Sequence, residues 1–179
     1  SLEKMVTDII RKLEEIARRH KTRSDEIVRR LEEIIKTHEK RSKELMDDLK
    51  RLVDEVRKKK DKAEEVKEKL RESLKRLAEE SRKVVEDLKR TIERIKKEST
   101  ETLKRIKDVV RRIREEARDK EPKEEDIRRL DEEVKDLERR SREEEERLER
   151  EVRELEKRSE ETIRRVEKKV RDLADELRK

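Results

Sequence analysis

The chain has 179 residues, of which 63% are charged and 27% hydrophobic, with one Pro and no Gly, Cys, Phe, Trp or Tyr. The absence of Cys excludes disulfides and thiolate metal sites, and no apolar run approaches the roughly 20 residues needed to span a bilayer. The net charge of +6 is a small excess of 59 basic over 53 acidic side chains. Because the two signs are interspersed, we expect neither a nucleic-acid partner nor a membrane partner.

Such a high charge is typical of disordered chains and of single solvated helices held by ion pairs between residues i and i+4. The spacing of the apolar residues argues against both classes, because it follows a helical period over the whole length. We therefore expect a folded, soluble helical protein. The chain shows no targeting signal, so the sequence leaves its location unknown, and cytoplasmic expression is the default expectation.

The first predicted helix covers residues 2–58 and begins after Ser1, which can cap it. Its apolar residues often come in adjacent pairs, such as Ile9 with Ile10 and Ile34 with Ile35. These pairs widen the buried face, so the helix needs partners on more than one side. The fold requires no partner outside the chain, and the alternative is a homo-oligomer or a separate helical partner that docks on this first helix.

The middle of this helix carries one pattern twice, with each residue recurring 18 positions later. The series is Ile16, His20, Ser24, Ile27 and Leu31, followed by Ile34, His38, Ser42, Leu45 and Leu49. Five α-helical turns take about 18 residues, so all ten side chains share one face of the helix. Two His/Ser pairs are therefore expected inside an apolar stripe, about 27 Å apart.

The second predicted helix covers residues 62–118 and follows a break near Lys60. Asp61 and Glu64 have the spacing of a capping box for its first turn. The 18-residue repeat continues here, because Ser81 recurs as Ser99 within a regular series of apolar residues.

The third predicted helix covers residues 123–178 and follows a second break at about Lys120. Pro122 ends the preceding pattern and suits the first position of a helix. Ser141 recurs as Ser159 in this helix, but position 145 is occupied by Glu145 where its repeat mates are Ile127 and Ile163. A carboxylate is thus expected at a core-facing position.

Three helices of equal length with short connections predict an all-α, up-down-up three-helix bundle that forms a single domain over residues 1–179. Because the repeat length fills five turns at the natural helical period, we expect a long, nearly straight and untwisted bundle. Folding the chain at its two breaks brings the polar interruptions into two layers. One layer comprises His20, Ser24, Ser99, Thr102, Ser141 and Glu145, and the other comprises His38, Ser42, Ser81, Ser159 and Thr162.

A buried polar network of this kind fixes which helices pair and in what register, because an unpaired buried polar group costs about 1–3 kcal/mol. The network itself does not predict which hydroxyl binds which imidazole nitrogen. Glu145 distinguishes the first layer from the second. It could also pair with a protonated His20, whereas His38 has no core carboxylate nearby in the pattern.

Metal and catalytic sites are weaker interpretations of the same residues. Each layer supplies one imidazole, so His20 with Glu145 gives at most two metal ligands. A His, a Ser and a Glu resemble a hydrolase triad, but a regular helical rod offers no oxyanion hole and no pocket. We therefore expect no metal, no cofactor and no enzymatic activity.

The repeated His/Ser and Ser/Thr layers, the capping-box and Glu-Pro connections and the missing Gly and aromatic residues resemble a known class of proteins. This class consists of computationally designed parametric helical bundles with buried hydrogen-bond networks, and the resemblance covers the whole chain. It implies a structural scaffold without a natural biochemical function. The alternative that it implies is a self-assembling or partner-binding component with a pH response from its histidines.

Overall fold

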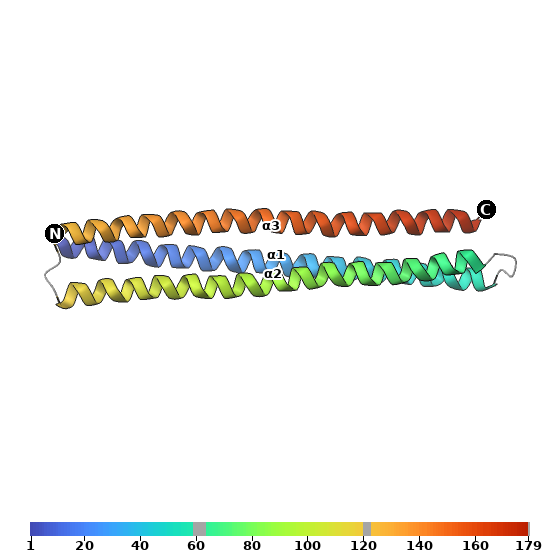
Figure 1. Ribbon diagram of the computed structural model, residues 1–179, viewed down its shortest axis with the longest axis horizontal. Coiled ribbons are helices and arrows are strands. Elements are labelled where there is room, and N and C mark those ends of the chain that lie inside the picture. Colours follow the sequence, from blue (N-terminus) through green and yellow to red (C-terminus); the bar gives the residue numbers. More distant parts are fainter. Residues whose placement is uncertain (59–63, 120–122, 179) are drawn as a thin grey trace. The chain divides into compact units, whose positions relative to one another are not determined.

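The computed structural model describes residues 1–58, 64–119 and 123–178, and in these ranges the chain forms three helices and no strand. Helix α1 covers Leu2–Lys58, α2 covers Glu64–Asp119 and α3 covers Glu124–Arg178 (Figure 1). The all-α class and the three-helix bundle predicted from the sequence are thus confirmed. The predicted capping box at Asp61 and the helix start at Pro122 lie outside the described residues.

The start of α1 shows how the sequence sets a helix boundary. The backbone N–H of Lys4 donates to Ser1 Oγ at 3.4 Å, and the N–H of Met5 donates to the Ser1 carbonyl at 3.2 Å. Ser1 thereby satisfies a backbone donor that the first turn would otherwise leave unpaired. Beyond it, Leu, Glu, Lys and Arg favour helix throughout α1.

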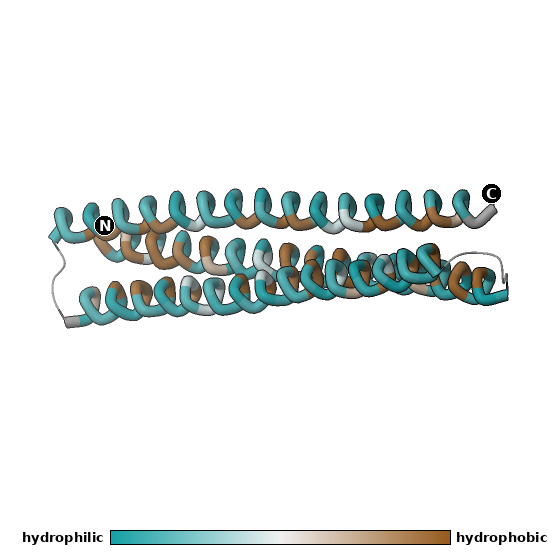
Figure 2. Tube along the Cα trace, turned by 45° about the vertical axis from the view of Figure 1, so that its right-hand side comes forward, coloured by the Kyte–Doolittle hydropathy of each residue, from teal (hydrophilic) through white to brown (hydrophobic). Residues whose placement is uncertain are grey.

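The chain divides into two compact units, and α1, α2 and α3 each contribute to both. The first unit combines Ser1–Arg29 with Ile92–Val152, and the second combines Arg30–Thr91 with Arg153–Lys179. Within each unit α2 runs opposite to α1 and α3 (Figure 1). Each helix is hydrophobic on one side and hydrophilic on the other (Figure 2), so each unit can bury an apolar core.

Each unit has a core to which all three helices contribute. In the first unit, Leu13 of α1, Ile113 of α2 and Ile127 of α3 belong to one cluster and are at most 1% exposed. In the second unit, Leu49 of α1 and Leu70 of α2 pack in a cluster with residues of α3. No large hydrophobic side chain is exposed among the described residues. The apolar face of α1 accordingly packs against α2 and α3 within the chain, and Ile10 and Ile34 at its edge are half-buried.

Candidate functional site

The first buried polar contact joins α1 to α3 in the first unit. His20 is 1% exposed, and its Nδ1 lies 3.2 Å from Ser141 Oγ. The other ring nitrogen, Nε2, is buried without a hydrogen-bond partner among the described residues. Ser141 is buried as well, so the hydrogen bond lies in the core.

The second unit repeats this contact one repeat further along both helices. His38 is 1% exposed, and its Nδ1 lies 2.8 Å from Ser159 Oγ, while its Nε2 again finds no partner in the described part of the chain. Each His is separated from its Ser by 121 positions. Ser42 Oγ and Ser81 Oγ add a contact of 2.7 Å between α1 and α2. The buried histidine hydrogen bonds expected from the sequence are therefore present.

The structure buries eight of the eleven polar residues that the sequence placed in the core. The eight are His20, Ser24, Ser141, Glu145, His38, Ser42, Ser159 and Thr162. Ser81, Ser99 and Thr102 are half-buried. Thr162 Oγ1 donates to the carbonyl of Arg158 in its own helix at 2.9 Å, because a helical Thr can reach the carbonyl four residues earlier. Its hydroxyl therefore does not donate across the layer.

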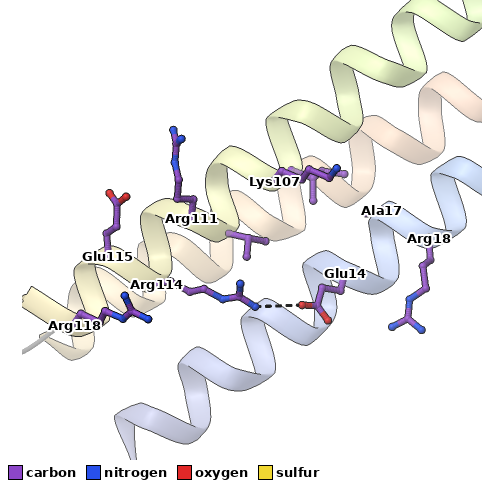
Figure 3. Close-up of a pocket in the computed structure, with 10 residues that line it drawn as sticks. Glu14, Ala17, Arg18, Lys107, Arg111, Arg114, Glu115 and Arg118 are labelled. Atoms are coloured by element: carbon purple, nitrogen blue, oxygen red, sulfur yellow. Dashed lines mark ion pairs between the residues drawn. The ribbon is translucent and has the colours of Figure 1, made fainter.

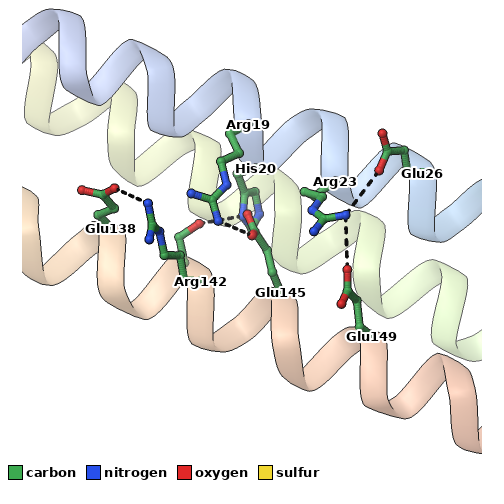
Figure 4. A network of polar contacts seen from close by, with 9 residues as sticks. Arg19, His20, Arg23, Glu26, Glu138, Arg142, Glu145 and Glu149 are labelled. Atoms are coloured by element: carbon green, nitrogen blue, oxygen red, sulfur yellow. Dashed lines mark hydrogen bonds and ion pairs between the residues drawn. The ribbon is translucent and has the colours of Figure 1, made fainter.

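Glu145 occupies the core-facing position that its repeat mates predicted, with 5% exposure. Its partner is Arg19 of α1, whose Nη2 donates to Glu145 Oε2 at 3.0 Å (Figure 4). His20, which was considered as a partner of Glu145 only in its protonated form, binds Ser141. Arg19 escaped the sequence analysis because its side chain is 44% exposed, and a long Arg side chain can extend from the surface to a buried carboxylate.

A sequence signal for this pair exists in the 18-residue repeat. The repeat mate of Arg19 is Thr37, and the repeat mate of Glu145 in the second unit is Ile163. The second unit therefore has neither the cation nor the carboxylate of this ion pair at the equivalent positions. The two departures from the repeat mark both residues as exceptional, but they do not show that the two side chains meet.

Ion pairs between α1 and α3 also follow the repeat. The ion pair between Lys12 and Glu138 in the first unit has an equivalent in the second unit, between Arg30 and Glu156. Likewise, the ion pair between Arg23 and Glu149 has its equivalent in the pair between Arg41 and Glu167. Every one of these pairs, and the Arg19–Glu145 pair, joins residues 126 positions apart, which is seven times the repeat length. In each unit α1 and α3 therefore advance in the same register.

The surroundings of the two histidines differ in acidic groups. In the first unit, burial raises the pKa of Glu144, and Glu98 raises it further, while His20, Arg147 and Arg105 act in the opposite direction. Glu98 Oε2 and Glu145 Oε1 are buried and lack hydrogen-bond partners among the described residues. The apolar pattern did not mark Glu98 and Glu144 as buried residues, because neither interrupts the apolar stripe.

The second unit places Thr162 and Ile163 where the first has Glu144 and Glu145. Here burial lowers the pKa of His38 below its usual 6.5, and the charge of Glu39 opposes this only in part. Burial acts in this direction because it disfavours the charged imidazolium. The two units thus hold the same His–Ser hydrogen bond, with a buried Glu145 beside it in the first unit and Ile163 at that position in the second.

The arrangement of these groups favours hydrogen bonding in a core. Among the described residues, no group of three or more His, Cys, Asp or Glu side chains is placed to hold a metal ion. No helix in the described ranges is long and apolar enough to cross a membrane. Each imidazole contacts a single serine, and both ring nitrogens are enclosed.

Replacing Arg19 by Ala should destabilise the protein, because the buried Glu145 carboxylate would lose its hydrogen-bond donor. We expect a loss of about 1–3 kcal/mol, nearer the lower value because Arg19 is 44% exposed. The double substitution Arg19→Thr with Glu145→Ile copies the second unit and should restore or exceed the original stability. Urea unfolding followed by circular dichroism measures both changes.

Arg30→Ala is the matched control, since its partner Glu156 is 38% exposed and loses little on being unpaired. Equal effects of the Arg19 and Arg30 substitutions would show that Glu145 is solvated in solution.

Comparison with known proteins places the chain in no established group. No protein family, curated protein or solved structure matches it.

Proposed function

We propose that the chain is a designed structural module, a helical-bundle scaffold whose buried polar contacts fix the pairing and register of its helices. The observation that carries this proposal is the strict recurrence of the contacts. The His–Ser hydrogen bond returns after one repeat, with the same separation of 121 positions. Two α1–α3 ion pairs return with the same separation of 126 positions. Both kinds of contact recur after one 18-residue repeat along each helix. This agreement supports a repeat geometry that the sequence specifies.

In this proposal the histidines specify structure and carry out no reaction. Each is enclosed in the core and binds one serine, so an imidazole that shifted along the helix would lose its partner at a cost of about 1–3 kcal/mol. The resemblance to designed bundles with hydrogen-bond networks agrees with such a role.

A second candidate function is a pH-responsive component of an assembly. The lowered pKa of the buried His38 favours it, because burial disfavours the imidazolium and the charge of Glu39 offsets this only in part. In this alternative a homo-oligomer or a separate helical chain is the partner, and protonation of His38 controls the assembly.

Light scattering during size-exclusion chromatography, combined with thermal unfolding, tests the scaffold proposal. We expect a monomer of 22.1 kDa with high helicity and one cooperative unfolding transition. A discrete oligomer that dissociates near pH 5 would favour the pH-responsive component. Partial helicity that depends on salt and melts without cooperativity would contradict both, since it indicates a single charged helix.

A further inference from the structure

The α1–α2 side of the first unit differs from its repeat in the second unit. In the second unit, Ser42 and Ser81 close this side with a hydrogen bond of 2.7 Å. Their repeat mates, Ser24 and Ser99, form no hydrogen bond with one another among the described contacts. Instead they line a groove of about 510 Å³, which we call the Ser24 groove.

A second groove lies next to it on the same side, and we call it the Ala17 groove. Its volume is about 710 Å³, and Ala17 of α1 lines it together with Ile106 and Val110 of α2 (Figure 3). The repeat mate of Ala17 is Ile35, which is buried. A small residue therefore stands where the second unit has a large one, and its size leaves this side open.

The rim of the Ala17 groove is strongly basic. Five cations line it, while the acidic residues are Glu14 and Glu115. The cations are Arg18, Lys107, Arg111, Arg114 and Arg118. Arg114 pairs with Glu14 across the groove at 3.6 Å (Figure 3). Arg18 and Lys107 form no ion pair with any described residue.

The Ser24 groove continues this charge, because Lys21, Arg29 and Lys96 line it against one carboxylate, Asp25. Elsewhere in the first unit, cations of α1 face carboxylates of α3, as in the pair of Lys12 with Glu138. On the α1–α2 side, Arg114 pairs with Glu14 and Arg111 pairs with Asp108 at 3.7 Å. The other cations that line the two grooves form no ion pair among the described residues, so this side keeps an excess of positive charge.

We propose that these two adjoining grooves bind an amphipathic helix whose apolar stripe is flanked by carboxylates, which makes a local four-helix arrangement. The apolar residues of the partner would pack over Ala17 and Val110, and its carboxylates would pair with the basic rim. Residues 14–29 of α1 span about 22 Å, so a partner helix of about 18 residues covers the site. This binding role adds to the scaffold function and does not depend on it.

Fluorescence anisotropy with a labelled synthetic peptide of about 18 residues tests this proposal. The probe has Leu at helical spacing, Glu on both flanks of the Leu stripe and Gln elsewhere, and a matched peptide has Lys in place of every Glu. The Glu peptide should bind saturably at concentrations up to about 200 μM, and raising the salt concentration should weaken it. The Lys peptide should not bind.

Two variants locate the site. Lys107→Glu combined with Arg111→Glu should weaken the Glu peptide by about tenfold or more, because two favourable charges become repulsive. Ala17→Ile should also weaken it by filling the groove, and Ile35 shows that the repeat accommodates this side chain. The matched control is Lys89→Glu in the second unit, at the repeat mate of Lys107, and it should leave binding unchanged within about twofold.

Several results would overturn the proposal. Absence of saturable binding would do so, as would equal binding of the Lys peptide. Equal effects of Lys89→Glu and of the double substitution Lys107→Glu with Arg111→Glu would also overturn it. Equal binding of an oligothymidylate of similar length would show a general polyanion surface instead. A dimer of the unliganded protein that Ala17→Ile converts to a monomer would assign the grooves to a second copy of the chain. Circular dichroism of each variant confirms that it is folded.

Discussion

Replacing His38 by Ala should lower the free energy of unfolding by about 2–4 kcal/mol. The His38 side chain is 1% exposed and holds Ser159 at 2.8 Å, so the substitution leaves both a cavity and an unpaired serine in the core. Urea unfolding at pH 7.5, followed by circular dichroism, measures the change. Glu33→Ala, at an exposed position of the same helix, is the control and should change stability by less than about 0.5 kcal/mol.

Removing the whole polar contact should have the opposite outcome. The quadruple variant His38→Leu, Ser42→Ala, Ser81→Ala and Ser159→Ala should be at least as stable as the original protein. It leaves no buried hydroxyl without a partner, and apolar groups replace the desolvated ones. If His38→Ala alone proved neutral, the imidazole would be hydrated in solution and the buried His–Ser contact would be absent.

Stability should fall as the pH drops below about 6.5, and His38 should cause this loss. Its folded pKa is lowered by burial, so the unfolded chain binds more protons than the folded one in the interval between the two pKa values. The loss begins near the unfolded pKa, grows as the pH falls and stops growing below the folded pKa. It amounts to about 1.4 kcal/mol for each pH unit that separates the two values.

Unfolding at pH 7.5 and pH 5 of the original protein and of His38→Asn and His20→Asn separates the two histidines. The His38 variant should lose the acid sensitivity, because Asn does not titrate in this range. The His20 variant should keep it. Glu144 contributes with the opposite sign, since its raised pKa makes the folded state bind the extra proton as the pH falls. Identical pH dependence of all three proteins would assign no sensing role to either histidine.

The sequence was sufficient to predict the helices and the main polar positions. The 18-residue repeat placed His20, His38, Ser141 and Ser159 on core-facing sides of helices, and all four are buried. Replacement of an isoleucine in the repeat identified Glu145 as a buried carboxylate. These predictions succeeded because helical periodicity alone decides which side of a helix faces the core.

The hydrogen-bond partners were not predictable from periodicity. Side-chain length decided that Arg19 binds Glu145, and the helical backbone supplied a nearby acceptor for Thr162. Ser24 is buried and Ser99 is half-buried, but the two form no hydrogen bond with one another among the described contacts, whereas Ser42 and Ser81 do. Ala17 stands where the repeat has Ile35, and it lines the neighbouring groove. Such local substitutions leave the repeat intact and change only the contacts.

Nitrogen NMR of the two imidazole rings, recorded across a pH titration and assigned with His38→Asn, tests most directly whether these histidines are enclosed, hydrogen-bonded groups. Because His38 Nδ1 lies 2.8 Å from Ser159 Oγ in a buried position, we expect one neutral tautomer at pH 7.5 with restricted exchange. We also expect the pKa of His38 to lie below its usual 6.5. A mixture of tautomers in rapid exchange, with the pKa of His38 at 6.5 or above, would contradict the buried His–Ser contact on which this account rests.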